Sequence, residues 1–320
     1  MLTALSLVLS GCAGTIADKG FAEVAALTEP RLGAAPTWAR SEADTAKARL
    51  ALDVLLAAPV GPNEAVRIAL LANPGLQASL AELGIAAADL AEASRPPNPG
   101  FTFSRIYGGG VAEIDRAVGM DLIELLTRPF AYRIVERQFD QAKLRAASDV
   151  LSAASEARRA RASAVAAAEI ARYAEDVNEA AAAQLDLARR MHAAGNLPLL
   201  DYAREQAFSA ETSASLARAR LAATSERESL LRALGLSGRE AVLKLPDRLP
   251  DLPPTARSDE GLEAKALAER LDVRMARAEV DGLARSLGLT RTTRFVNVLE
   301  ASYLSNSATG EPTRRGYEIA

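Results

Sequence analysis

Side chains that could carry out covalent or metal chemistry are scarce in this chain. Among its 320 residues there is one cysteine, Cys12, and one histidine, His192. A single cysteine excludes an internal disulfide and a Cys-x-x-Cys metal site, and a single histidine leaves little for a metal centre or a catalytic triad. The sequence also shows no acid–base or phosphate-binding constellation. We therefore expect neither enzyme activity nor a cofactor or bound metal.

Cys12 stands at the end of a short apolar segment, residues 1–11. Such a segment is too short to span a bilayer and is typical of the core of a signal peptide. The sequence Leu9-Ser10-Gly11-Cys12 resembles the bacterial lipoprotein processing box, in which the cysteine becomes lipidated and N-terminal. The resemblance implies a signal peptide at 1–11 and lipidation of Cys12, and Ala13 suits sorting to the outer membrane. The alternative is a chance apolar start with a buried cysteine.

The composition favours helices and gives no sign of a nucleic-acid partner. Hydrophobic residues make up 49% of the chain but aromatic residues only 4%, and alanine carries the excess. Alanine has the highest helix propensity, which favours helices over a wide core filled with aromatic rings. The net charge is −3 with both signs interspersed, whereas a nucleic-acid-binding protein usually carries a basic patch or stripe. We therefore expect no nucleic-acid partner.

Residues 130–234 predict two long helices folded back on each other at Gly195-Asn196-Leu197-Pro198. On each helix, mostly small residues recur at alternating steps of four and three, the spacing of a coiled-coil seam. The first seam comprises Ala146, Val150, Ala153, Ala157, Ala160, Ala164, Ala167, Ala171, Ala174, Asn178, Ala181, Leu185 and Ala188. The second comprises Ala203, Ala207, Ala210, Ala214, Ala217, Leu221, Thr224, Glu228 and Leu231. At about 100 Å the first helix is far longer than a bilayer core, and arginines recur along it, so it is not a membrane span.

The segments before this helical hairpin predict an arm, a broken helix and a β-hairpin. Residues 12–62 lack sustained periodicity apart from a short helix at 41–56, and we interpret them as an N-terminal arm. A helix is expected to begin with Asn63 as its N-cap, to break at Asn73-Pro74 and to end near Ser94. Residues 100–123 alternate with period two around three glycines, which predicts a β-hairpin. Its strands are long enough to cross an outer membrane at a tilt, and a small soluble hairpin is the alternative.

After the helical hairpin the same order begins again. Residues 236–258 form a proline-rich extended link, and a helix is expected at 259–287. A strand that includes Phe295 and Tyr303 follows, and a second strand starts at Tyr317. Residues 63–235 and 259–320 therefore predict two copies of an internal repeat, of which the second is incomplete. A second long hairpin is expected to follow, and the 320-residue chain alone is expected to form long helices but no conducting pore.

Taken in order, these features resemble the outer membrane efflux protein family, the TolC-like channels. The resemblance rests on Asn73-Pro74-x-Leu76, on Arg270-x-Asp272-Val273 at the matching place in the second copy, and on the tip sequence from Gly195 to Asp201. It departs from the family at Leu271, where proline is usual. It implies a mainly α fold with a small β part. A long antiparallel α-helical hairpin would serve as a coiled-coil tunnel element, and the β-hairpin would join a trimeric outer-membrane β-barrel.

The resemblance also implies a function. The chain would be the outer-membrane channel component of a tripartite efflux or type I secretion system, a passive exit duct across the periplasm and outer membrane. It would be a lipid-anchored homotrimer that meets outer-membrane lipid, a periplasmic adaptor protein and an inner-membrane pump. One alternative is a periplasmic adaptor (membrane fusion) protein, which should flank its hairpin with glycine- and valine-rich β-segments. The other is a structural coiled-coil lipoprotein, which would need neither the β-hairpin nor the repeat.

The hairpin tip is the candidate adaptor-binding site. It comprises Gly195, Asn196, Leu197, Pro198, Leu199 and Asp201. Gly195 permits the reversal, Pro198 suits a first helical turn, and Asp201 lies near the positive end of the second helix. Serving only as capping residues is the simpler interpretation, and the two are compatible.

Other polar and sulfur-containing residues are expected to have structural roles. We expect His192 to be a surface residue of the tip rather than a ligand, and Met191 and Met275 to be packing residues. Arg158, Arg159 and Arg161 are expected to form a solvated or tunnel-facing stripe.

Overall fold

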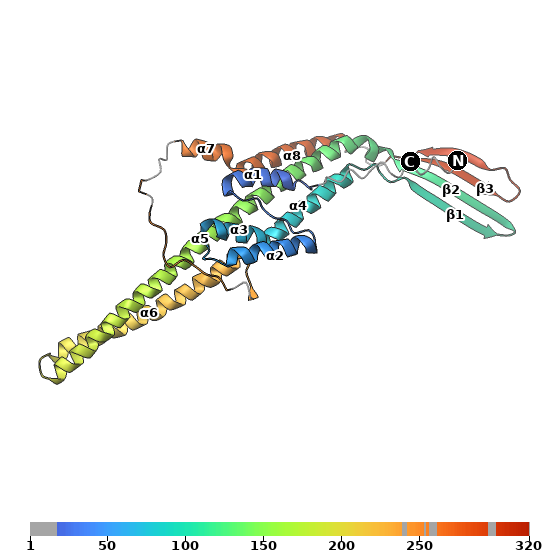
Figure 1. Cartoon of the computed structure of the whole chain (residues 1–320). Helices are drawn as coiled ribbons and strands as arrows, with labels where there is room; N and C mark the ends of the chain where they lie inside the picture. The colour runs from blue at the N-terminus through green and yellow to red at the C-terminus, as the bar shows by residue number, and fades with distance from the viewer. Residues whose placement is uncertain (1–17, 239–241, 253, 256–260, 294–298, 320) are drawn as a thin grey trace. The chain divides into compact units, whose positions relative to one another are not determined.

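Figure 1 shows the computed structural model, which describes residues 18–238, 242–252, 254–255, 261–293 and 299–319. The helices are α1 (Phe21–Leu32), α2 (Glu42–Leu56), α3 (Pro62–Ala72), α4 (Pro74–Ala93), α5 (Leu122–Ala193), α6 (Leu199–Leu234), α7 (Leu262–Glu269) and α8 (Leu271–Thr293). The strands are β1 (Gly100–Gly108), β2 (Val111–Asp121), β3 (Glu300–Ala308) and β4 (Arg314–Ile319). The chain folds as two compact units, which are described separately. One combines residues 1–24, 81–146 and 266–320, and the other combines 25–80 and 147–265.

The first unit contains an antiparallel sheet with the strand order β1-β2-β3-β4. The mainly α fold with a small β part is therefore confirmed. Strand β2 pairs with β3 across a long stretch of sequence, with Val118 opposite Tyr303. Residues 294–298, which include the predicted strand residue Phe295, lie outside the described residues. The prediction that a fourth strand only starts at Tyr317 is wrong, because β4 begins at Arg314 and pairs along its length with β3.

The two faces of this sheet differ in chemistry. Phe101, Val118, Tyr303 and Tyr317 lie in one cross-strand row, and the face that carries them is called the aromatic face. The rings of Tyr303 and Tyr317 lie 5.5 Å apart between centroids. Successive residues of a strand point to opposite sides of the sheet. The residues that alternate along each strand with those of the aromatic face therefore form a second face, called the polar face. Such alternation is typical of a sheet with a different environment on each side.

The N-terminal arm contains a helix that the sequence did not predict, α1. The Asp18 carboxylate accepts hydrogen bonds from the backbone N–H groups of Gly20 at 3.1 Å and Ala22 at 3.0 Å. These contacts satisfy donors that have no partner within the helix at its start. The short helix predicted at 41–56 is present as α2, where the Ser41 hydroxyl accepts from the Asp44 N–H at 3.1 Å.

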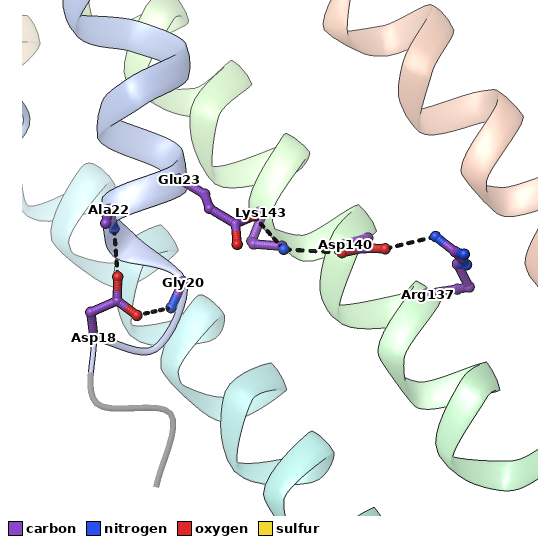
Figure 2. Close-up of polar contacts among 7 residues, drawn as sticks. All are labelled: Asp18, Gly20, Ala22, Glu23, Arg137, Asp140 and Lys143. Carbon is purple, nitrogen blue, oxygen red and sulfur yellow. Dashed lines mark hydrogen bonds and ion pairs between the residues drawn. The ribbon is translucent and has the colours of Figure 1, made fainter. Parts of the chain in front are cut away.

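A chain of charged side chains holds the start of α1 against α5 (Figure 2). Lys143 forms an ion pair with Glu23 and a second with Asp140 at 3.0 Å, and Asp140 also pairs with Arg137 at 3.0 Å. Burial alone would lower the pKa of Lys143, but the hydrogen bonds that its ammonium donates to Glu23 and Asp140 outweigh burial and raise the pKa above the ordinary value. Lys143 is therefore held charged in the contact between the two helices.

Helix α5 begins at Leu122, so the predicted start of the long hairpin at residue 130 is wrong. The Asp121 carboxylate accepts hydrogen bonds from the N–H groups of Ile123 at 2.8 Å and Glu124 at 2.9 Å. This N-cap, at the last residue of β2, starts the helix well before Pro129. The helix continues through Pro129, although proline usually marks a helix boundary.

The predicted break at Asn73-Pro74 is confirmed, and it lies in the second unit. The Asn73 side chain forms hydrogen bonds with two different helices there. Its Oδ1 accepts from the Leu76 N–H at 3.1 Å, which caps α4, while its Nδ2 donates to the Ala233 carbonyl at 2.9 Å. A single amide side chain thus starts α4 and binds the end of α6. The expected N-cap role of Asn63 is wrong, because α3 begins at Pro62 after Gly61, and proline is favoured at a first helical position.

The single helix predicted at 259–287 is two helices, α7 and α8, separated at Arg270. The Arg270 guanidinium donates to both carboxylate oxygens of Asp272, at 3.0 and 2.5 Å, and Asp272 also accepts from the Val273 N–H at 3.0 Å. The hydrogen bond from Arg270 is the largest cause that lowers the pKa of the Asp272 carboxyl from 3.8 to about 2. The break between α7 and α8 therefore coincides with the Arg270–Asp272 pair, and no proline stands at this junction.

The predicted seam of α5 is confirmed, but the predicted seam of α6 is wrong. All the predicted α5 seam residues are buried or half-buried. On α6, the predicted stripe from Ala203 to Glu228 is exposed, and the buried residues are instead Thr212 and Leu216. The polar seam residue Asn178 accepts hydrogen bonds from Ser213 at 2.8 Å and Thr212 at 3.4 Å. Both registers have steps of four and three, and burying leucine removes more apolar area from water than burying alanine.

The core of the second unit joins α2, α3, α5 and α6 with the proline-rich link. Its buried side chains are Leu52, Val60, Ala65, Ile68, Ala69, Ala157, Ala164, Leu230, Leu231, Leu234, Leu236 and Leu243. The Val60 N–H donates to the Lys244 carbonyl at 2.9 Å, while the Val60 carbonyl accepts from Nε of Arg161 at 3.1 Å. Arg161 is only 5% exposed, so its expected place in a solvated or tunnel-facing stripe is wrong. Burial lowers the pKa of Arg161 below the ordinary value of arginine, and the charge of Glu64 opposes that shift.

Candidate functional site at the hairpin tip

The tip reverses the chain through a short turn centred on Gly195. Its φ of +78° is in the left-handed region, where L-residues with a side chain are strained. The Gly195 N–H donates to the His192 carbonyl at 2.9 Å, and the Asn196 N–H donates to the Met191 carbonyl at 2.9 Å. This is the Schellman pattern that ends a helix. A Cβ on Gly195 would meet no atom within 4 Å, so backbone conformation alone favours glycine here.

Helix α6 begins one residue after Pro198. Pro198 occupies the N-cap position with no side-chain hydrogen bond, so its expected place in the first helical turn is shifted by one residue. The Pro198 carbonyl accepts from the Tyr202 N–H at 3.1 Å. Asp201 lies in the first turn, as expected, and pairs with Arg204 at 3.0 Å. Its negative charge is favourable at the positive end of the helix dipole.

The His192 side chain contacts residues on both sides of the turn. Its Nδ1 lies 2.8 Å from the Leu197 carbonyl, and because a carbonyl only accepts, Nδ1 carries the hydrogen. The ring stacks on Tyr202, with centroids 5.1 Å apart and planes at 6°. His192 thus joins the end of α5 to the start of α6. Among the described residues there is no group of His, Cys, Asp and Glu side chains that could hold a metal ion.

Charged side chains surround the turn in local pairs. Arg189 and Arg190 both contact Asp186, at 2.6 and 2.5 Å, one turn before the end of α5. Exposed pairs of this kind contribute little to stability, typically about 0.3–0.5 kcal/mol each. The arginines also lie near the negative end of the helix dipole, which favours them. They leave polar donors exposed beside the turn.

Exposed leucines are the most distinctive feature of the tip. Leu199 is 67% exposed and Leu200 is 63% exposed, directly after the turn. Leu187 and Met191, which lie one helical turn apart on α5, are also exposed, so the expected packing role of Met191 is not seen at this site. The site prediction included Leu199 and omitted Leu200 and Leu187. Two consecutive leucines beside a turn, where polar residues are usual, are the sequence signal that could have identified Leu200 together with Leu199.

The predicted tip residues from Gly195 to Asp201 are therefore brought together in one turn. Cys12, the predicted lipidation site, lies outside the described residues. The remaining polar clusters, around Lys143 and around Asp272, hold helices in place.

Comparisons with known proteins define the class to which this fold belongs. No protein-family model and no curated protein sequence matches the chain. Solved structures do match. CusC aligns over 81% of this chain with a TM-score of 0.60 at 13% identity, and the CmeC outer membrane channel of Campylobacter jejuni aligns over 81% with a TM-score of 0.64 at 16% identity. OprN aligns over 91% with a TM-score of 0.59 at 19% identity.

The chain has the fold of the TolC-like outer-membrane channels. It covers 65% of CusC, 61% of CmeC and 69% of OprN, so it spans about two thirds of the length of these channels. The fold predicted from the sequence is confirmed over this part.

Proposed function

We propose that the chain is a subunit of an outer-membrane channel that serves as a passive exit duct of a tripartite efflux or type I secretion system. The observation that best supports this proposal is the combination, in one chain, of two features: a 72-residue helix in a coiled-coil hairpin, and a sheet with one aromatic and one polar face. A hairpin of that length suits a tunnel wall across the periplasm, since the helix measures about 110 Å. A two-faced sheet suits a membrane-embedded barrel wall.

Exposed apolar surface on the hairpin supports assembly into a homotrimer. The alanine stripe of α6 from Ala203 to Ala217 is exposed although its spacing is that of a coiled-coil seam. On α5, Ile170 and Tyr173 are also exposed. Contiguous apolar surface of this kind marks a contact with another protein surface. Neighbouring hairpins of a closed ring would cover it.

The proposed partners are a periplasmic adaptor at the hairpin tip and, through it, an inner-membrane pump. The exposed leucines Leu199 and Leu200 would pack into the adaptor, and the exposed arginines beside them would supply polar contacts. Lipidation of Cys12 would add an anchor in the outer membrane. The chain itself would supply no energy, and no catalytic activity forms part of the proposal.

Cross-linking in cells tests the adaptor contact directly. A photo-reactive amino acid at Leu200 should give a cross-link to a periplasmic adaptor, identified by mass spectrometry. The matched control is Leu50 on α2, which is 68% exposed against 63% for Leu200. An adaptor cross-link of equal yield from Leu50, or none from Leu200, would reject the tip as the docking site.

A charge reversal tests the same contact through transport. Asp201→Lys opposes the helix dipole by about 0.3–1 kcal/mol, too little to unfold the hairpin. We expect reduced export with nearly unchanged protein abundance. Glu42→Lys is the control, since Glu42 is also an acidic residue in the first turn of a helix, α2, is exposed, and does not belong to the tip. Normal export by Asp201→Lys would count against tip docking.

The alternatives are less well supported. A periplasmic adaptor should flank its hairpin with glycine- and valine-rich β-segments on both sides, whereas helices and a four-stranded sheet accompany this one. A structural coiled-coil lipoprotein would need no sheet. The similar solved structures favour neither the adaptor nor the coiled-coil lipoprotein.

A further inference from the structure

Charge is segregated between the two faces of the sheet. Following the register from Phe101 and Val118, the charged strand residues on the aromatic face are Arg105, Arg116 and Arg315. On the polar face they are Glu113, Asp115, Asp121, Glu300, Glu318 and Arg314. The aromatic face is therefore cationic, and the polar face is mostly acidic. Aromatic and aliphatic side chains surround charges of one sign only.

The three arginines lie close together. Arg116 is opposite Phe103 and Ser305, and Ser305 is opposite Arg315, so the two arginines share one row. Two strand spacings separate them, about 10 Å. Arg105 is opposite Ile114, which makes it a diagonal neighbour of Arg116 at about 7–8 Å. Within the described part of the chain, no acidic side chain forms an ion pair with any of the three.

The position of the arginines along the strands limits what can pair with them. The row of Phe101, Val118, Tyr303 and Tyr317 lies toward the strand ends that connect to helices, and the arginines lie on the turn side of it. If this face contacts lipid, as the proposed function requires, an unpaired arginine there is costly. An arginine removes that cost by extending its apolar stem along the sheet until the guanidinium reaches the headgroup layer. Guanidinium groups bind phosphate oxygens through paired hydrogen bonds.

We propose that Arg105, Arg116 and Arg315 form a binding site for the phosphate groups of anionic membrane lipids. The site rests on the proposed membrane function, and it adds a preference for lipid headgroup charge on the side of the strand turns. The occupant follows from charge complementarity, because three exposed arginines share one face of the sheet with aromatic side chains and with no acidic residue. Zwitterionic lipid carries no net charge and would satisfy them less well.

Fluorescence quenching by brominated lipid tests the site in the full chain. The one native tryptophan, Trp38, is changed to Phe, and Phe103→Trp then reports from the position opposite Arg116. The protein is placed in neutral-detergent micelles that contain phosphatidylcholine or phosphatidylglycerol brominated on the acyl chains. Quenching of the tryptophan at position 103 gives a binding constant for each lipid. We expect the constant for phosphatidylglycerol to exceed that for phosphatidylcholine by about fivefold for each arginine engaged. The preference should fall as salt rises.

Variants separate phosphate binding from general surface charge. Arg105→Gln, Arg116→Gln and Arg315→Gln together should bring the ratio of the two binding constants near one. The corresponding three lysine substitutions should keep only part of the preference, because the charge and the long stem remain but the paired hydrogen bonds of the guanidinium are lost. A preference fully retained by the lysine variant would mean general charge attraction and would overturn the phosphate site. Removing three exposed helix arginines, by Arg159→Gln, Arg218→Gln and Arg232→Gln, should leave it unchanged. Equal loss in this control would overturn the proposal.

A reporter on the other face separates the proposal from the function on which it rests. Thr102→Trp, next to position 103 but on the polar face, should not be quenched by either lipid. Quenching at position 103 by both lipids equally would overturn the phosphate site and leave the membrane-facing sheet standing. No quenching at position 103, or quenching only at position 102, would overturn both.

Discussion

Two glycines with the same backbone conformation have different reasons to be glycine. Gly195 and Gly235 have φ of +78° and +75°, and each ends a helix with the Schellman hydrogen bonds. A Cβ at Gly195 would project into open space. A Cβ at Gly235 would lie 2.5 Å from the Ala72 carbonyl oxygen and 2.6 Å from the Asn73 Cα. Gly235 is thus required both by conformation and by the close approach of the α3–α4 junction.

Alanine substitution at the two glycines should separate these causes. Gly195→Ala should lower the free energy of unfolding by about 1–2 kcal/mol, the cost of a left-handed conformation. Gly235→Ala should lower it by about 3–5 kcal/mol, because backbone must also move. Denaturant unfolding followed by circular dichroism measures both. Equal effects would mean that the junction yields to the added methyl group.

The Arg270–Asp272 pair predicts a pH dependence. The hydrogen bond from Arg270 lowers the pKa of Asp272 to about 2 from 3.8, so the charged carboxylate is favoured by folding. Its stabilising contribution is present above about pH 4 and is lost as the pH falls through about 2. We expect wild type to exceed Asp272→Asn in thermal midpoint at neutral pH, with the difference shrinking across this window. Arg270→Gln should shift the loss toward the ordinary pKa of aspartate, and a difference that is constant with pH would contradict the assignment.

At the scale of elements, leucines decide which face of α6 packs on α5. Leu216 is 8% exposed and Leu221, a residue of the predicted seam, is 71% exposed. An alanine-rich helix offers several stripes with steps of four and three, and their small side chains distinguish them weakly. The face that buries Leu216 is also the one where Thr212 reaches Asn178. The remaining alanine stripe is left for a neighbouring helix in the proposed assembly.

Two leucine truncations test this orientation. Leu216→Ala should destabilise the chain by about 2–5 kcal/mol, as expected for a buried leucine. Leu221→Ala should change its stability by no more than about 0.5 kcal/mol while the chain is monomeric. Thermal or denaturant unfolding of the monomer distinguishes them. Destabilisation by Leu221→Ala alone would restore the seam predicted from the alanine spacing.

At the scale of the whole molecule, the proposed lipid anchor is Cys12, which lies outside the described part of the chain. The Leu9-Ser10-Gly11-Cys12 sequence predicts processing to a mature chain that starts at a lipid-modified cysteine. Intact-mass analysis after expression in a Gram-negative host should show that species. Cys12→Ser should retain the unprocessed mass. An unmodified Met1 in the mature wild-type protein would contradict the prediction.

Several features of this protein were determined by the sequence alone, because they depend on neighbours within a few residues. The steps of four and three predict the long helices, Gly195 predicts their reversal, and Asn73-Pro74 predicts the break between α3 and α4. Each is a local matter of backbone conformation, helix propensity or capping. The same local rules placed most of the candidate tip residues in one turn. They misplaced the start of α5, because the cap formed by Asp121 was not recognised.

Other features were decided only by the tertiary structure. The facing side of α6, the burial of Arg161 against the Val60 carbonyl, and the pairing of β2 with β3 each join residues far apart in the chain. Alanine spacing is nearly degenerate between stripes, and burying an arginine is costly unless a hydrogen-bond acceptor such as the Val60 carbonyl, distant in sequence, compensates it. Strand register likewise depends on which partner strand is present. Long-range packing chose among alternatives that local physical chemistry left nearly equal in free energy.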